Sequence, residues 1–274
     1  EPGSHLRSVP TDEERPEWAA LAVGQQARAR NPTRAAVAVL AREGPRRPAR
    51  DKAPAPSMNR GLFIVIEDID GAGTTTLARA LDAKLRRVIA ARAEAAAGAL
   101  TTWLTREPTE GAFGAAARVW MREPAERPRD PRAMALAFCL DRYRHVEQIE
   151  GMRDQNVHVL CDRYVLSTRS YQEDTVPWPV LDWLLGGLPV PDVTLLLDCE
   201  LEVAARRRLG RGGEPDLYER DAQLQAAVRA RYLRAAASGD PALGRIVVID
   251  ANPRAEEVEL AAWRVVRDLL DKRG

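Results

Sequence analysis

Cysteine is scarce in this chain, and the few cysteines present form no recognisable metal-binding pattern. Cys139, Cys161 and Cys199 are the three cysteines among 274 residues, and they lie far apart in the sequence. Such separations fit no spacing of metal ligands. Cys161 and Cys199 end apolar runs, so we expect both to be small core residues in the reducing cytoplasm.

The chain also lacks a long apolar run and an excess of one charge sign. No apolar segment approaches the ~20 residues that a membrane-spanning helix requires, and no signal peptide is visible at the start of the sequence. The 41 basic and 40 acidic residues give a formal net charge of +1, so no global field attracts nucleic acid or a membrane. We therefore expect a soluble, cytoplasmic protein with neither of these partners.

The first 57 residues differ in composition from the remainder. Residues 1–57 are rich in Arg, Ala, Pro and Glu, and they end in a Pro-rich charged segment at 44–56. This composition predicts a disordered or partly helical extension. Met58 follows directly, so we interpret the extension as a tail or as translated sequence upstream of the true start. A regulatory or docking arm is the alternative.

Beyond the extension, apolar strands alternate with helical segments. The expected strands are 62–67, 100–105, 157–161, 193–198 and 245–250. The expected helices are 75–97 with a stop at Gly98, 131–153, 180–186, 201–209, 221–237 and 255–272. This order predicts a parallel sheet covered on both faces. Ligands of such sheets bind beyond the carboxyl ends of the strands, where the sequence places Glu67, Arg106, Asp162 and Asp198.

A Gly-containing turn joins the first expected strand to the first expected helix, within residues 63–76. Its layout is that of a phosphate-binding loop, G-x-x-x-x-G-K-[ST], whose backbone N–H groups cradle phosphate at a helix N-terminus. Gly71 and Gly73 leave the backbone bare for an approaching oxygen, and Thr75 would place its hydroxyl on Mg²⁺. An ordinary strand-turn-helix with Thr as N-cap is the alternative.

Two positions of this loop depart from the pattern. Asp68 stands where the first Gly belongs, and Thr74 stands where the Lys belongs. The missing Lys would supply a point charge to the β- and γ-phosphates, so an arginine from elsewhere has to supply it. Asp68 adds negative charge near the phosphates, although Asp tolerates a left-handed backbone. Asp70 is a second carboxylate inside the loop, suited to accept a hydrogen bond from an acceptor substrate.

Five segments of the chain resemble motifs of the thymidylate kinase family, in the same order and between the right elements. Residues 66–73 resemble E-G-x-D-G-x-G, and residues 105–109 resemble its T-R-E-P segment. Residues 138–142, 161–172 and 191–198 are similar to F-x-x-x-R, D-R-Y-x-x-S-x-x-A-Y-Q and P-D-x-T-x-x-L-D. Each motif is weak alone, but the ordered set is specific.

The resemblance implies a P-loop NTPase fold, with a five-stranded parallel sheet flanked by helices on both faces, formed by residues 58–274. It implies transfer of the ATP γ-phosphoryl group to dTMP, giving dTDP and ADP for dTTP biosynthesis, with Mg²⁺ as cofactor and a homodimer as the assembly. A diverged, weakly active or inactive nucleotide-binding relative is one alternative, because of Asp68 and Thr74. A kinase of the same fold for another monophosphate is a second.

The resemblance also implies roles for individual residues. The catalytic residues would be Asp70, Arg163 and Arg211. The donor phosphates would contact Asp68, Ile69, Gly71, Ala72, Gly73, Thr74, Thr75 and Thr76. The acceptor would be bound by Arg106, Phe138, Arg142, Arg163 and Gln172, with Phe138 stacked on thymine and Arg142 reading the base. Thr75 and Asp162 would hold the metal.

An arginine cluster at 206–216 leads into a Gly-rich turn and resembles the family's lid over ATP. Arg207, Arg208 and Arg211 are candidates for the missing lysine charge, with Arg211 in the part expected to move. Arg79, one turn into the first helix, is a weaker candidate. A solvated helix end, where arginines complement the helix dipole, is the alternative.

Without the resemblance, some of these residues have simpler interpretations. Phe138 on an Ala/Leu-rich helix is more often a core residue than a stacking platform. Arg142 would fit a solvated helix face, and Asp162–Arg163 would fit a surface ion pair worth under ~1 kcal/mol.

Overall fold

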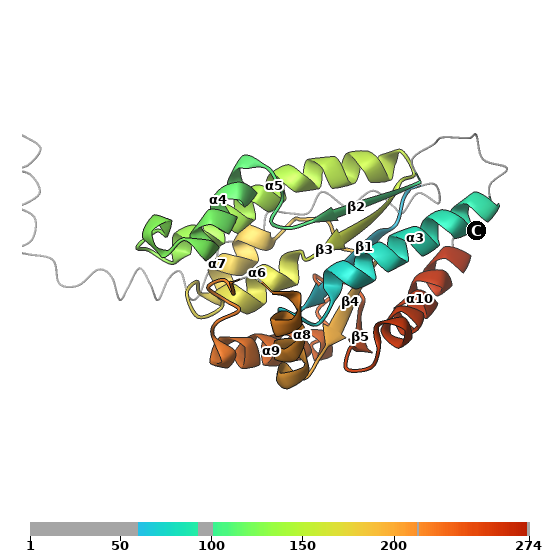
Figure 1. Ribbon diagram of the computed structural model, residues 1–274. Coiled ribbons are helices and arrows are strands. Elements are labelled where there is room, and N and C mark those ends of the chain that lie inside the picture. The colour runs from blue at the N-terminus through green and yellow to red at the C-terminus, as the bar shows by residue number, and fades with distance from the viewer. Residues whose placement is uncertain (1–59, 93–100, 213, 273–274) are drawn as a thin grey trace, which may run out of the picture. The chain divides into compact units, whose positions relative to one another are not determined.

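The computed structural model describes residues 60–92, 101–212 and 214–272, and within them one five-stranded parallel sheet of order β2-β3-β1-β4-β5 (Figure 1). The strands are β1 (Phe63–Asp68), β2 (Thr102–Arg106), β3 (His158–Asp162), β4 (Val193–Asp198) and β5 (Ile246–Asp250). Every pairing between neighbouring strands is parallel. The predicted fold class is confirmed, and each strand begins within two residues of its expected start.

Eight α-helices and a short 3-10 helix connect and cover the strands in the described residues. They are α3 (Thr74–Arg92), α4 (Ala112–Arg122), η2 (Pro124–Glu126), α5 (Arg132–Asp154), α6 (Val165–Gln172), α7 (Trp178–Leu185), α8 (Leu201–Arg211), α9 (Ala222–Ala237) and α10 (Ala255–Asp271). The sequence-based expectation missed α4 and α6. Helix α6 contains Val165 and Thr168, residues of low helix propensity, and its formation depends on packing against β1 and α9.

The sheet lies between two layers of helices, as Figure 1 shows. Helices α3 and α10 contact each other and one face, whereas α5, α6 and α9 pack on the other. Strand β1 is central and buried along its whole length, so its residues alternate between two cores. Ile64 and Ile66 join the core beside α3 and α10, and Phe63 and Val65 join the core beside α5. The carboxyl end of β1 is thereby fixed from both sides.

Helix α8 extends further than expected. We predicted a helix that ends at Leu209, but α8 continues to Arg211. Gly210 costs only about 1 kcal/mol relative to Ala in a helix, so it does not end α8. The helix stops at Gly212, whose φ of +71° closes the last turn with an N–H bond to the Leu209 carbonyl.

The cysteines and the apolar character of the helices agree with the sequence-based expectations. All three cysteines are buried, as expected for Cys161 and Cys199. No helix in the described ranges is long and apolar enough to cross a membrane. The extension at 1–57 and the helix stop at Gly98 lie outside the described residues, so both stay predictions.

Candidate active site

The turn between β1 and α3 forms the base of the site. Gly71 and Gly73 have φ values of +96° and +115°, a backbone region that side chains disfavour. A Cβ at Gly71 would lie 2.6 Å from the Ala204 carbonyl oxygen of α8, whereas a Cβ at Gly73 would meet nothing within 4 Å. Helix α8 therefore packs on the first half of the loop and leaves the second half open.

The two unusual loop residues contact each other directly. Thr74 donates from its backbone nitrogen and from Oγ1 to Asp68 Oδ2, at 3.2 and 3.1 Å. Both side chains are buried, with Asp68 only 1% exposed. Burial raises the pKa of the Asp68 carboxyl to about 7, because desolvation outweighs the attraction of Arg163 while Asp162 and Asp70 add repulsion. The replacements at the Gly and Lys positions thus form one local unit.

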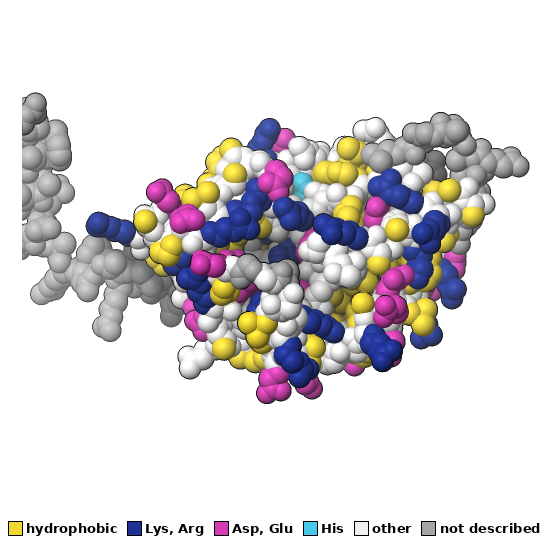
Figure 2. Space-filling model, in the orientation of Figure 1, with side chains coloured by type: hydrophobic (Ala, Val, Ile, Leu, Met, Phe, Trp, Pro, Cys, Tyr) yellow, Lys and Arg dark blue, Asp and Glu magenta, His cyan; other side chains and the backbone are white. Residues whose placement is uncertain are grey.

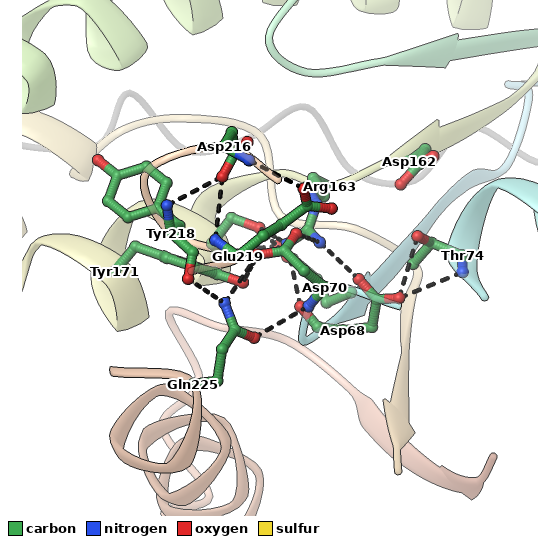
Figure 3. A network of polar contacts seen from close by, with 12 residues as sticks. Asp68, Asp70, Thr74, Asp162, Arg163, Tyr171, Asp216, Tyr218, Glu219 and Gln225 are labelled. Atoms are coloured by element: carbon green, nitrogen blue, oxygen red, sulfur yellow. Dashed lines mark hydrogen bonds and ion pairs between the residues drawn. The ribbon is translucent and has the colours of Figure 1, made fainter. Parts of the chain in front are cut away.

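Arg163 lies at the centre of the loop network in Figure 3. Its Nη2 donates to Asp68 Oδ1 and Asp70 Oδ1, both at 2.8 Å, and its Nη1 donates to the Asp68 carbonyl oxygen at 3.0 Å. Its own φ of +70° is unusual for a residue other than Gly, and such backbone strain is typical of functional sites. The proposed alternative of a surface Asp162–Arg163 pair is wrong, because Arg163 pairs with the loop carboxylates.

Asp70 is held in one orientation by residues from three elements. Tyr171 of α6 and Gln225 of α9 donate to Asp70 Oδ2 at 2.9 and 2.8 Å, opposite the bond from Arg163 to Oδ1. Gln225 Oε1 also accepts from the Asp70 backbone nitrogen at 3.2 Å. The network in Figure 3 therefore fixes a partly exposed carboxylate at the mouth of the site.

Thr75 and Asp162 meet at the start of α3. The Thr75 hydroxyl donates to Asp162 Oδ2 at 2.7 Å, and Asp162 ends β3 beside the loop. A hydroxyl and a carboxylate at hydrogen-bond distance are oxygen donors of the kind that Mg²⁺ prefers. The two residues predicted to hold a metal are therefore adjacent and chemically suited to it.

Two cavities adjoin at this end of the sheet. One, of about 640 Å³, is bordered by Thr74, Thr75 and Thr76 of the loop and by arginines from α3, α4 and α8. The other, of about 160 Å³, lies between α5, α6 and Tyr218. Asp70 and Arg163 border both. Figure 2 shows basic side chains gathered around the hollow on this face.

The smaller cavity contains the predicted base-binding residues. Phe138 is half-buried at its wall, with Arg142 and Gln172 beside it. Arg142 is 2% exposed and donates to Glu107 Oε2, Thr168 Oγ1 and the Tyr164 carbonyl at 2.7, 2.9 and 2.8 Å. The alternative prediction, that Arg142 lies on a solvated helix face, is therefore wrong. Gln172 Nε2 donates to the Tyr218 hydroxyl at 2.8 Å, so the wall is pre-organised.

The arginines around the larger cavity differ in how they are bound. Arg106 is exposed and pairs with Glu110 at 2.6 Å. Arg207 donates to backbone carbonyls, including those of Ala72 and Ala251 at 3.2 and 2.7 Å, and Arg208 donates to the Asp70 carbonyl. These two lid candidates clamp α8 onto the loop. The side chain of Arg211 lies outside the description.

Sequence reasoning missed several residues of the site. Arg118 and Arg122 border the larger cavity from α4, a helix that was not expected, and Gln225 contributes from the distant α9. The amphipathic pattern of residues 112–122 could have predicted helix α4 and, with it, Arg118 and Arg122. Conversely, Glu67 and Asp198 lie at strand ends but serve the fold. Glu67 accepts from backbone and hydroxyl groups beneath the site, and Asp198 pairs with Arg229 at 2.6 Å.

Comparisons with known proteins agree with this geometry. The profile of the family described as thymidylate kinase matches residues 66–261. The thymidylate kinase of Halorhodospira halophila is 36% identical over 226 residues, which cover 78% of this chain and 98% of that protein. The thymidylate kinase of Thermomicrobium roseum is 36% identical over 219 residues, covering 77% and 97%.

A solved structure supports the same relationship. The thymidylate kinase from Candida albicans, described as having broad substrate specificity, superposes with a TM-score of 0.61 at 25% identity. The match covers 78% of this chain and 93% of that one. Sequence, fold and site geometry together show that the chain belongs to the thymidylate kinase family.

Proposed function

We propose that this protein transfers the γ-phosphoryl group of ATP to dTMP, giving dTDP and ADP for dTTP synthesis. One observation carries the proposal: a small cavity walled by Phe138, Arg142 and Gln172 adjoins a larger cavity over the phosphate-binding loop. Asp70 and Arg163 border both cavities, which is where an acceptor phosphate and a donor γ-phosphate have to meet for in-line transfer.

On the acceptor side, the Phe138 ring would stack on thymine, and the amide of Gln172 would lie near its polar edge. The fixed guanidinium of Arg142 would orient the base from within the wall. Asp70 would face the sugar and acceptor phosphate, and Arg106 would contact the monophosphate from β2. Arg106 is suited to this role because its exposed partner Glu110 is a weak competitor.

On the donor side, the loop from Asp68 to Thr76 would surround the phosphates. Thr75 and Asp162 would hold Mg²⁺, which neutralises and orients phosphate oxygens when bound. Arg163 would stabilise the charge of the transferring group, since phosphoryl transfer depends on positioning and positive charge rather than on a protein nucleophile.

Arg211 is our proposed lid arginine, because Arg207 and Arg208 are engaged with backbone carbonyls. Arg211→Ala is expected to lower kcat with little change in the KM for dTMP. Unchanged turnover would remove Arg211 from the mechanism. Arg144→Ala is a suitable control, because Arg144 is exposed on α5, pairs with Glu147 and borders neither cavity.

The direct test is to measure diphosphate formation from dTMP, dUMP, CMP and AMP with Mg·ATP. We expect dTMP to be the best acceptor and dUMP to follow, because one methyl group is worth only about 1–3 kcal/mol in a pocket. Preference for CMP or AMP would overturn the assignment. The Asp68–Thr74 contact favours a second candidate, a relative that binds nucleotide and transfers poorly; tight binding of ATP without dTDP formation would identify it.

We also propose a cytoplasmic homodimer. Exposed large apolar side chains occur on helices α4, α5 and α7, namely Phe113, Val119, Leu136, Leu140, Tyr143, Val180 and Trp183. Helix α4 packs on α5, and the Tyr143 hydroxyl of α5 donates to the Leu184 carbonyl of α7. Such surfaces mark protein interfaces. Sedimentation of the full chain and of Trp183→Glu tests it, with monomer expected for the variant.

A further inference from the structure

We infer that Asp68 and Thr74 act as one coupled pair that occupies part of the loop's phosphate cradle, so that the pair sets how strongly the protein holds its phosphoryl donor. This inference rests on the proposed function for the identity of the donor. It assigns a specificity-determining role to two residues that would otherwise count only as lost motif positions.

The contacts show what the carboxylate replaces. In a phosphate-binding loop, backbone N–H groups at the start of the helix point at the anion. Here the Thr74 N–H points instead at Asp68 Oδ2, 3.2 Å away, and the Thr74 hydroxyl reinforces the bond at 3.1 Å. Asp68 also borders the 640 Å³ cavity. The Asp68 side chain therefore takes a donor that a phosphate oxygen would otherwise take.

The same carboxylate also engages the central cation. Arg163 divides its Nη2 between Asp68 and Asp70, at 2.8 Å to each. A guanidinium that neutralises two carboxylates has less charge to offer an incoming phosphate. Asp68 thus weakens the donor site twice, through the Thr74 amide and through Arg163.

The two replacements make physical sense only together. With Gly at 68, the buried Thr74 hydroxyl would lose its acceptor, which costs free energy. With Lys at 74, the ammonium group would pair with the Asp68 carboxylate before it reached a phosphate. Asp68→Gly would free the Thr74 amide and Arg163 but would add no lysine. Thr74→Lys would add a lysine whose charge the Asp68 carboxylate neutralises. The effects of the two changes on donor affinity should therefore not add.

Other cations remain available to the donor. Arg79 of α3 and Arg122 of α4 are exposed at the same cavity and make no side-chain hydrogen bond or ion pair with any described residue. They supply positive charge without contacting Asp68. We therefore expect weakened binding of ATP in the parent protein rather than its loss.

A double-mutant cycle tests the inference. Calorimetric titration of Mg·ATP and, separately, of dTMP would be performed on the parent, Asp68→Gly, Thr74→Lys and the double variant. We expect the double variant to bind Mg·ATP roughly 10- to 100-fold more tightly than the parent. Thr74→Lys alone should change affinity less than about threefold, and dTMP affinity should stay within about twofold throughout.

Two outcomes would overturn the coupled pair: no gain in the double variant, or single-variant effects that add to the double effect. Asp198→Asn is the matched control, because Asp198 is also an Arg-paired carboxylate at a strand end but borders neither cavity; its Mg·ATP affinity should equal the parent's. If the double variant does not fold, Asp68→Asn supplies the test, with several-fold tighter Mg·ATP binding expected and unchanged affinity contradicting the inference.

The same titrations separate this inference from the proposed function. A parent protein that binds Mg·ATP but neither binds nor phosphorylates dTMP would refute the proposed acceptor. The double-mutant cycle on Mg·ATP affinity would still test the Asp68–Thr74 pair. A parent that makes dTDP while the cycle shows no gain would refute only the inference.

Discussion

The smaller cavity, which we propose as the acceptor cavity, and the loop, which we propose as the donor loop, are built by different physical means. In the acceptor cavity, Arg142 and Gln172 are buried and their donors are already bonded to neighbouring residues. In the donor loop, the carboxylates of Asp68 and Asp70 pair with Arg163, which lies in the turn after β3. One region is preformed for a flat base, whereas the other has to rearrange its own ion pairs to receive phosphates. Pre-organisation lowers the cost of binding, so dTMP should be held more readily than ATP.

Removal of Arg163 should have the largest effect, because it belongs to both regions. We expect Arg163→Ala to lower kcat by about 10³-fold or more, as for other arginines that stabilise phosphoryl transfer. Steady-state kinetics at saturating dTMP and ATP provide the measurement. Arg144→Ala is the control, since Arg144 is exposed and pairs with Glu147 on the surface of α5. Equal losses in the two variants would contradict a special role for Arg163.

Arg142 tests how far the acceptor cavity depends on a buried ion pair. Arg142→Met would leave Glu107 buried without its cation, so we expect the free energy of unfolding to fall by about 3–5 kcal/mol. Urea denaturation measures this loss. Arg144→Met on the same helix should change it by less than about 0.5 kcal/mol. A small effect for Arg142→Met would mean that the wall is not held by this pair.

Phe138 separates the two regions kinetically. Phe138→Ala should raise the KM for dTMP about 10- to 100-fold, because base stacking on an aromatic ring is worth about 1–3 kcal/mol. The KM for ATP should not change. Phe138→Leu keeps an apolar side chain without the π-face and should give an intermediate value. A parallel rise in both KM values would favour a structural role for Phe138.

The stability of the folded protein should also depend on pH through Asp68. Its pKa is about 7 in the folded protein against an ordinary 3.8, so the folded state keeps a proton that the unfolded chain has released. Stability from this group is therefore lost as pH rises from about 4 to 7, and levels off above. A shift of this size is worth about 4 kcal/mol, so we expect the Tm of the parent to fall across this window by about 10 °C relative to Asp68→Asn; parallel curves would contradict the raised pKa.

The sequence predicted the strands, most helices and the loop because these follow from local patterns. Strand β1 is apolar throughout and is followed by Gly71 and Gly73, a signal that needs no tertiary information. Helix α6 escaped prediction because tertiary packing overrides its weak helix propensity. The helix predicted at 201–209 ends two residues before α8 does, because the glycine whose positive φ ends the helix is Gly212.

Most of the predicted site residues lie close together in the structure, but their hydrogen-bond and ion-pair partners were not predictable from the sequence. The motif order put Asp68, Thr74 and Arg163 near one another, yet it did not reveal that Thr74 donates to Asp68 or that Arg163 is shared with Asp70. The sequence could not predict the contact between Gln225 and Asp70, because the two residues lie 155 positions apart.

The sequence by itself determined the parallel α/β sheet, the phosphate loop at the end of its first strand and the order of the nucleotide-binding segments. Apolar periodicity and glycine conformation act over a few neighbouring residues and predict the sheet and the loop, whereas the order of the segments was inferred from the resemblance to thymidylate kinases. Only the tertiary structure decided which charges pair: Asp68 with Thr74 and Arg163, Arg142 with Glu107, and Arg207 with loop carbonyls. Those choices depend on burial and distance between remote segments, which set the strength of every electrostatic contact.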